Sequence, residues 1–320
     1  MKKWGEKMGL IFGPVKSRRL GLSLGLELVP KKICSMDCLY CEVGKTTLLT
    51  YERKAYYSWE EIEASLHNAK QRESDFDVLT LTGSGEPTLN IHFEKTVEEA
   101  KKILHKPISV LTNSSTLMLP SVKEALSKVH LVLASLDAAL EKSFYFLNRP
   151  AKGVNLSDII EGLKTLRENM EGELWLEVLL VKGINDKFED LRALKEAIDY
   201  IKPHKIQLNT VVRPPAYLLA KPLSYTELEH IKSFLGERVE VIYPQNLDGA
   251  KSFSQETIKK LSVDEIELLI LDYLKRRPAT LSELLVFFNY EGGLQRLLEK
   301  MINDGKIKRI THQGEIFYSA

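Results

Sequence analysis

Every cysteine of the 320-residue chain lies in the stretch ICSMDCLYCEVG at residues 33–44, as Cys34, Cys38 and Cys41. A disulfide does not explain this cluster, because three is an odd number and the spacing is too tight for a useful crosslink. Buried structural cysteines would have no reason to gather within eight positions. Three neighbouring thiolates are instead typical of a metal centre.

Two kinds of metal centre agree with three thiolates. A structural zinc ion needs four nitrogen or sulfur ligands, and the nearest histidine, His67, falls in a predicted helix well away from the cysteines. A [4Fe–4S] cluster held by three cysteines leaves one iron without a protein ligand, where a substrate can bind and be activated. The sequence therefore favours an iron–sulfur cluster with an open iron.

The spacing Cys34-x-x-x-Cys38-x-x-Cys41, with Tyr40 directly before the third cysteine, resembles the signature of the radical S-adenosylmethionine (SAM) superfamily. The resemblance implies two cofactors, a [4Fe–4S] cluster on the three cysteines and SAM on the open iron. It also implies that one electron from the reduced cluster cleaves SAM to methionine and a 5′-deoxyadenosyl radical, which abstracts hydrogen from a substrate. The protein's part is then to position the reactants and exclude water. An electron donor such as flavodoxin or ferredoxin is the expected partner.

The run LTGSGEPTL at residues 81–89 matches a second segment of the resembled superfamily, of Gly-Gly-Glu type. The match implies that Gly83, Ser84, Gly85 and Glu86 contact the amino group of SAM. Glycines in such a turn let backbone approach a ligand closely, and the carboxyl ends of barrel strands are where active sites form. The alternative is an ordinary turn with a solvated glutamate.

Polar residues also end the later strands of the predicted barrel. By looser analogy with the superfamily, Asn113, Ser135 and Asp137 contact the carboxylate or ribose of SAM, and Tyr40 packs near its adenine. Asn113, Ser135 and Asp137 each have a second interpretation as a hydrogen-bonded core or strand-end residue, because polar groups in apolar strands must find partners. The alternative for Tyr40 is that it simply covers the cluster.

Three further segments resemble an uncharacterised branch of the superfamily that is related to the tRNA wyosine-base enzymes. They are FGPVKSRRLGLSLGLELVP (12–30), VKGIND (181–186) and LNTVVRPPA (208–216). The resemblance implies that basic residues at the barrel mouth grip an anionic substrate, for which the arginine fork is suited. These residues are Lys16, Arg18, Arg19 and Arg213, with Lys182 a weaker candidate. Solvated loop arginines or internal salt bridges are the alternative. The wyosine reaction itself is not expected, because its second cluster needs further cysteines.

Six strand-like runs alternate with helical patterns along the first 212 residues. Several runs are almost continuously apolar, as expected for parallel strands buried on both faces. A repeated strand-then-helix order implies right-handed crossovers and a parallel sheet or barrel. Six units are fewer than the eight of a complete barrel, so we predict an α/β fold with an open, partial (β/α)6 barrel. The strand-like runs are 24–29, 76–83, 108–113, 130–137, 174–181 and 205–212.

A second, smaller domain is predicted after the barrel. A strand-like run at 238–244 and the polar segment NLDGAKSFSQETIKK at 246–260 precede three helical patterns and a hairpin, which is typical of a winged helix. We therefore divide the chain into a barrel at 1–250 and a linker with a winged helix at 251–320. From Leu261 onward there are eight Lys and Arg against nine Asp and Glu, a net charge of −1. This charge favours docking or packing on the barrel over binding of RNA or specific reading of DNA.

The whole chain has a net charge of +1, so no global field draws it to nucleic acid or membranes. No apolar run approaches the roughly 20 residues that span a bilayer. Clustered cysteines of this kind are typical of a reducing, cytoplasmic setting. The sequence predicts a radical SAM enzyme acting on an RNA base, a peptide or a small metabolite. The alternative from another class is a non-catalytic iron–sulfur redox regulator that binds nucleic acid through the winged helix.

Overall fold

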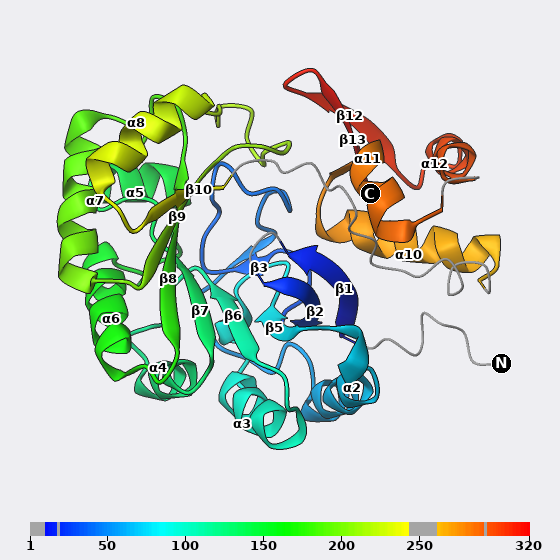
Figure 1. The fold of residues 1–320 in the computed structure, drawn as a ribbon, viewed down its shortest axis with the longest axis horizontal. Helices are drawn as coiled ribbons and strands as arrows, with labels where there is room; N and C mark the ends of the chain where they lie inside the picture. Colours follow the sequence, from blue (N-terminus) through cyan, green and yellow to red (C-terminus); the bar gives the residue numbers. More distant parts are fainter. Residues whose placement is uncertain (1–9, 18–19, 243–260, 291–292) are drawn as a thin grey trace.

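Eight strands form one open sheet in the order β1-β2-β5-β6-β7-β8-β9-β10 in the computed structural model, which describes residues 10–17, 20–242, 261–290 and 293–320 (Figure 1). Every neighbouring pair runs parallel except β1 with β2. The strands are β1 (Ile11–Ser17), β2 (Gly21–Glu27), β5 (Val78–Thr82), β6 (Ile108–Thr112), β7 (Leu131–Ser135), β8 (Glu173–Leu180), β9 (Lys205–Thr210) and β10 (Val239–Val241). The predicted partial barrel is confirmed.

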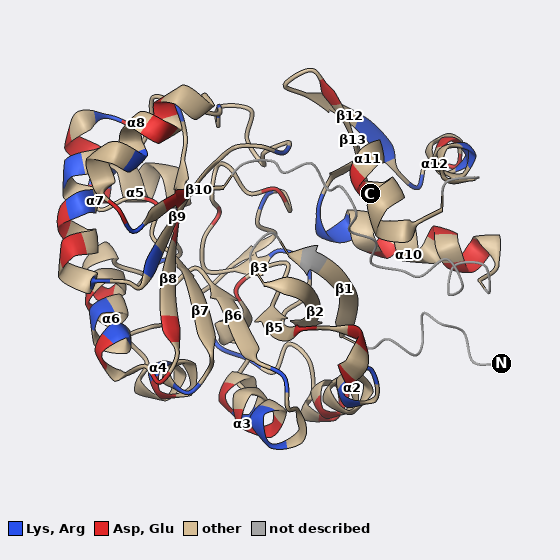
Figure 2. Ribbon diagram, viewed as in Figure 1, with Lys and Arg blue, Asp and Glu red and all other residues tan. Residues whose placement is uncertain are grey.

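Helices connect the strands and cover the outer face of the sheet (Figure 1). They are α2 (Trp59–Gln71), α3 (Phe93–Ile103), α4 (Pro120–Ser127), α5 (Glu141–Asn148), α6 (Leu156–Asn169), α7 (Phe188–Ile201) and α8 (Tyr225–Leu235), with short 3-10 turns η1 (Glu73–Asp75) and η2 (Pro87–Leu89). Lys, Arg, Asp and Glu residues are spread along these helices, on the outside of the barrel (Figure 2). The apolar faces pack on the sheet, which is why the sequence shows apolar residues at helical spacing.

Alternate residues of a barrel strand point to opposite faces of the sheet, one toward the hydrophobic core and the other toward the cavity inside the barrel. Along β8, the buried positions are Leu174, Leu176, Val178 and Leu180, each at 0% exposure. The alternate residue Glu177 is half-buried and lines the cavity described below. Because side chains alternate along a strand, one strand supplies both the packing surface and a polar group to the barrel interior.

A separate pair of short strands lies in the loop that follows β2. These strands are β3 (Ile33–Cys34) and β4 (Leu48–Leu49), which pair parallel to each other as a two-stranded sheet. The cysteines at positions 38 and 41 lie between them. The short sheet therefore closes the base of the cysteine-bearing loop.

The C-terminal unit, residues 261–320, has its own hydrophobic core and a three-stranded sheet in the order β11-β13-β12. Its elements are α10 (Val263–Arg276), β11 (Ala279–Thr280), α11 (Leu281–Phe288), α12 (Leu294–Asn303), β12 (Lys308–His312) and β13 (Glu315–Ser319). Three helices and a hairpin were predicted and are present, whereas β11 was not predicted. The assignment to the winged-helix class stays a prediction, and the polar segment at 246–260, with the boundary at 250/251, lies outside the described residues.

The C-terminal unit packs against the barrel at several points. The Gln313 side-chain amide donates to the carbonyl of Val211 at 2.7 Å. Arg276 lies 3.4 Å from the Glu27 carboxylate and over the ring of Phe12, 4.4 Å from its centroid. Of the three roles considered for this unit, packing on the barrel is therefore the one that the structure shows. Within the described part of the chain, we find no helix with the length and apolar character to span a membrane.

Candidate functional site

A cavity of about 440 Å³ lies at the mouth of the barrel. Its floor is formed by the ends of β2, β5, β6 and β7, and one wall by the cysteine loop, residues 31–47. Cys34, Cys38 and Cys41 all line it, and no histidine is among its described lining residues. The remaining side of the cavity is formed by residues of the C-terminal unit, which we call the roof. It consists of Leu269, Asp272, Tyr273 and Arg276 on α10, Arg277 directly after α10, and Phe287 and Phe288 on α11.

The cysteine loop is held against the strand-end turn at Gly83–Glu86 by backbone contacts. Lys32 N donates to Ser84 O at 2.9 Å, and Glu86 N donates to Ile33 O at 3.2 Å. A Cβ on Gly85 would stand 1.7 Å from the Ile33 carbonyl oxygen, so only glycine fits this position. This packing fixes the start of the cysteine loop one residue before Cys34.

Each cysteine sulfur lies beside the nitrogen of a side-chain donor. The Nδ2 of Asn113 is 3.4 Å from Cys34 Sγ, and the Nδ2 of Asn148 is 3.5 Å from Cys38 Sγ. The Lys32 ammonium is 3.1 Å from Cys41 Sγ. Burial raises the pKa of the Cys34 thiol to about 12, and Glu86 adds to this rise. Burial raises the pKa of Cys38 in the same way, followed by the charge of Asp137.

The three donors give the sulfurs the surroundings of metal ligands. Hydrogen bonds to a ligating sulfur fix its orientation and tune the metal centre, and a buried ammonium offsets the negative charge of thiolates. Lys32 is only 4% exposed. Burial by itself lowers the pKa of Lys32, but the neighbouring Cys41 and Cys34 outweigh it, so the pKa is raised.

The cysteines are not gathered around a single ion. The described residues contain no group of three His, Cys, Asp or Glu side chains drawn together around one metal ion. The donor set, three cysteines on one wide cavity, fits a cluster of several metal ions.

Glu86 is buried and joins the ends of β5 and β6. Its carboxylate accepts hydrogen bonds from the hydroxyl of Thr88 at 2.6 Å, the hydroxyl of Thr112 at 2.8 Å and the backbone N–H of Asn113 at 2.7 Å. Burial raises its pKa despite these donors. Glu86 therefore positions Asn113, which in turn contacts Cys34.

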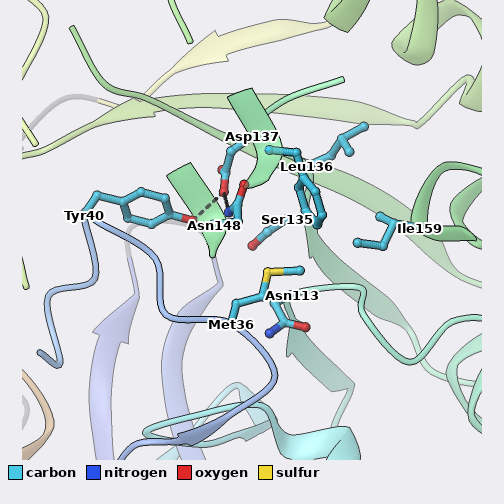
Figure 3. Close-up of a pocket in the computed structure, with 9 residues that line it drawn as sticks. Met36, Tyr40, Asn113, Ser135, Leu136, Asp137, Asn148 and Ile159 are labelled. Carbon is cyan, nitrogen blue, oxygen red and sulfur yellow. Dashed lines mark hydrogen bonds between the residues drawn. The ribbon is translucent and has the colours of Figure 1, made fainter. Parts of the chain in front are cut away.

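Tyr40, Asp137 and Asn148 form a buried network behind the cysteine loop (Figure 3). The Tyr40 hydroxyl donates to Asp137 Oδ2 at 2.5 Å, and Asn148 Nδ2 donates to the same oxygen at 2.7 Å. Burial raises the pKa of Asp137 to about 6. Asp137 and Ser135 also line a second cavity of about 10 Å³, which has room for about one water molecule.

The predicted SAM-contacting residues are brought together by the fold. Those lining the large cavity are Tyr40, Gly83, Ser84, Gly85, Glu86, Asn113 and Ser135. Asp137 lines only the small cavity and reaches the large one through the Tyr40 hydroxyl. Which of these residues contact SAM stays a prediction.

Of the predicted substrate-gripping residues, the two with described side chains, Lys182 and Arg213, do not line the cavity. Arg18 and Arg19 are outside the described residues, as is the side chain of Lys16. Lys182 is an exposed partner of Glu227 at 3.0 Å. Arg213 is buried between the barrel and the C-terminal unit, where it pairs with Glu42 and Glu283. This geometry favours the alternative that Arg213 forms an internal salt bridge.

Several cavity residues were not predicted from the sequence. Lys32 and Glu27 lie near the cysteine loop, and the pair of lysines directly before Ile33 was the available signal. The Glu27 carboxylate accepts hydrogen bonds from the Ser84 N–H at 3.0 Å and hydroxyl at 2.5 Å. The residues of the roof had no signal, because nothing in the sequence indicates which face of the C-terminal unit meets the barrel.

Comparison with known proteins agrees with this arrangement. The family described as the Radical SAM superfamily matches residues 28–197. The chain is 35% identical over 314 residues to the UPF0026 protein MJ1312 of Methanocaldococcus jannaschii, covering 97% of this chain and 96% of that protein. It is 34% identical over 312 residues to a protein of Brachyspira hyodysenteriae named GTPase Obg, covering 97% of this chain but only 45% of that protein. The shared stretch does not include the phosphate-binding P-loop of GTPases, whose pattern is Gly-x-x-x-x-Gly-Lys-Ser/Thr. Gly44-Lys45-Thr46 match the end of this pattern, but Leu39 stands at the position of its first glycine.

A solved structure with a similar fold is that of TYW1 with a lysine-pyruvate adduct bound. The TM-score is 0.51 at 17% identity, over 68% of this chain and 74% of that chain. At this identity the likeness shows the fold and no more.

Proposed function

Because the chain belongs to the radical SAM superfamily, and within it to the UPF0026 family, we propose that it is an enzyme with a [4Fe–4S] cluster on Cys34, Cys38 and Cys41. The cluster and SAM, when bound, supply reductive cleavage of SAM to a 5′-deoxyadenosyl radical that abstracts hydrogen from a substrate. The observation that carries this proposal is the cavity of about 440 Å³ that all three cysteines line, each with a nitrogen donor at its sulfur.

The three donors would tune the cluster. Asn113 and Asn148 would donate to the ligating sulfurs of Cys34 and Cys38, and Lys32 would place a positive charge beside Cys41. Hydrogen bonds to ligand sulfurs and nearby positive charge favour the reduced, more negative state of a cluster. Lys32 is held for this task because its backbone is fixed to Ser84.

The strand ends would hold SAM beside the cysteine loop. SAM carries an ammonium, a carboxylate and an adenosine. The floor of the cavity offers backbone groups of residues 83–86 and the side chains of Asn113 and Ser135. Tyr40 would border the adenine. Asp137 would act through Tyr40, because it accepts a hydrogen bond from the Tyr40 hydroxyl and so orients the Tyr40 ring.

The roof would exclude water from the site and contact the substrate. It places aromatic rings and two arginines opposite the cysteines, which supports an enzyme over a regulator that only senses the state of its cluster. The substrate classes under the proposal are an RNA base, a peptide and a small metabolite. A flavodoxin or ferredoxin in the cytoplasm would supply the electron.

The test is anaerobic reconstitution with iron and sulfide, reduction, addition of SAM and chromatography for 5′-deoxyadenosine. The proposal expects 5′-deoxyadenosine from the reduced wild type and none from Cys38→Ala or from unreduced protein. A four-iron cluster that neither binds nor cleaves SAM would contradict the proposal. That result would favour the iron–sulfur regulator.

A further inference from the structure

The roof places two arginines at the cavity, and their surroundings differ. Arg276 pairs with two carboxylates, those of Asp272 and Glu27, and covers the face of Phe12, although its buried Nε has no hydrogen-bond partner among the described residues. The side chain of Arg277 has one hydrogen bond to a described residue, from Nη2 to the Tyr273 hydroxyl at 2.5 Å. Among the described residues no carboxylate lies within 4.0 Å of its guanidinium. Since a guanidinium has five N–H donors, most of those on Arg277 have no partner among the residues that the structure describes.

Arg213 explains why Arg277 lacks a carboxylate partner. The two nearby carboxylates are those of Glu42, which follows Cys41, and Glu283 on α11. Both pair with Arg213, Glu42 at 3.2 Å and Glu283 through a second nitrogen. The remaining guanidinium nitrogen of Arg213, Nε, donates to Pro278 O at 3.2 Å. Both acids therefore bond directly to Arg213, while their charges also act on Arg277. Burial by itself lowers the pKa of Arg277, but Tyr273, Glu42 and Glu283 outweigh it and raise the pKa, so Arg277 stays charged where it lines the cavity.

An aromatic surface adjoins Arg277. The rings of Tyr273 and Phe287 have centroids 4.5 Å apart, and both residues line the cavity. The Arg277 guanidinium lies 5.2 Å from the Tyr273 ring centroid. A planar group would pack against these rings, while an arginine fork beside them would bind a carboxylate or phosphate with two hydrogen bonds.

We propose that Arg277, Tyr273 and Phe287 form a substrate subsite in the roof for a molecule that carries a carboxylate or phosphate next to a planar apolar group. This proposal rests on the proposed function, because the cavity is a substrate pocket only if the protein is an enzyme. The subsite would make the C-terminal unit part of that pocket. It gives to Arg277 the anion-binding role that the sequence suggested for Arg213.

The experiment is calorimetric titration of the reconstituted full-length protein with three probes. Phenyl phosphate and phenylacetate carry the ring with an anion, and benzyl alcohol carries the ring alone. The wild type should bind at least one anionic probe about tenfold or more tightly than benzyl alcohol, as one charge-assisted bidentate pair predicts. Which anion binds more tightly tells a phosphate site from a carboxylate site.

Variants assign the binding to Arg277. Arg277→Met should weaken the preferred probe by about tenfold or more, and Arg277→Lys should retain part of the affinity because it keeps the charge but not the fork. The matched control is Arg296→Met, since Arg296 is exposed on α12 of the same unit. Circular dichroism melting of each variant checks that the unit is folded, and the conservative Arg277→Lys variant carries the test if Arg277→Met does not fold.

Three results would overturn the subsite. These are equal affinity of the wild type for all three probes, unchanged affinity in Arg277→Met, and loss of SAM binding in Arg277→Met with the probe still bound. The last result would assign Arg277 to the SAM carboxylate. Probe binding does not require SAM cleavage, so a protein that binds the probe but forms no 5′-deoxyadenosine would refute the proposed function and leave the subsite standing.

Discussion

At the scale of single residues, the three cysteines make the first prediction. Replacing Cys34, Cys38 or Cys41 by Ala should each prevent stable assembly of the cluster, because the chain has no further cysteine to substitute as a ligand. Iron and sulfide per chain after reconstitution should fall by about tenfold or more. Ser157→Ala, at an exposed position of α6, is the control and should bind iron as the wild type does. An intact cluster in any cysteine variant would contradict the assignment.

Glu86 makes the second prediction at this scale. It is 1% exposed and accepts hydrogen bonds from Thr88, Thr112 and Asn113. Glu86→Ala should lower the free energy of unfolding by about 3 kcal/mol, because these donors would be left buried without an acceptor. Glu86→Gln should cost less, since one oxygen remains. Urea unfolding of the cluster-free protein measures both.

The result for Glu86→Ala bears on how that variant can be used. An unfolding free energy equal to that of the wild type would show that the Glu86 network is absent in solution. If the destabilisation is found, loss of SAM cleavage in Glu86→Ala would not show that Glu86 contacts SAM. The loss could equally follow from the support that Glu86 no longer gives to Asn113 and Cys34.

How much of the site the sequence predicts depends on sequence distance. Cys34, Cys38, Cys41 and the turn at Gly83–Glu86 could be found because their chemistry is written in short contiguous segments. Asn148 could not, because it meets Cys38 only after α5 folds back on the cysteine loop, 110 positions away in sequence. Contacts of this range depend on the fold.

At the scale of elements, the capping box of α8 gives a pH prediction. The Glu227 carboxylate accepts from Ser224 N and Oγ, each at 2.7 Å. These bonds, with a smaller effect of Lys182, lower the pKa of Glu227 from 4.5 to about 2. A lowered folded-state pKa stabilises the fold fully above pH 4.5, and the contribution is lost as the pH falls towards 2.

Glu227→Gln tests this contribution. At neutral pH the variant should be less stable by about 0.5–1 kcal/mol, typical of a capping interaction. The difference from the wild type should shrink as the pH falls below 4.5. Thermal melts across this pH range measure it, with the exposed Glu237→Gln as the control. A difference that stayed constant or grew on acidification would refute the role of the carboxylate.

Strands and helices were predicted to different degrees for physical reasons. Several central strands, namely β5, β6, β7 and β9, are buried at nearly every position, so they stand out as apolar runs. The edge strand β1 contains Gly13-Pro14 and shifts register between Phe12 and Val15, so its pattern is not regular. Helix α5 (EKSFYFLN) has four consecutive apolar residues at 144–147 and not apolar residues at helical spacing, so it shows no clear helical period.

At the scale of the whole molecule, Arg213 joins the barrel, the cysteine loop and the C-terminal unit. Its side chain is 9% exposed and pairs with Glu42 and Glu283. Removing one member of a buried ion-pair network leaves the others uncompensated, which commonly costs about 3–5 kcal/mol. Because the two parts have separate cores, we expect the loss to weaken their packing on each other before it unfolds either one.

Arg213→Met should therefore expose the roof and the cysteine loop without melting the barrel. Hydrogen exchange should accelerate in α11 and at Glu42, while the amides of β6 and β7 stay protected. The reconstituted cluster should bleach faster in air, since the roof excludes solvent from it. Lys182→Met is the matched control, because its ion pair with Glu227 is exposed and such pairs contribute about 0–1 kcal/mol.

Combined with Glu283→Gln in a double-mutant cycle, Arg213→Met should show a coupling of about 2 kcal/mol. Additive effects, or exchange that rises equally in β6 and α11, would mean that Arg213 supports the barrel and not the closure of the roof.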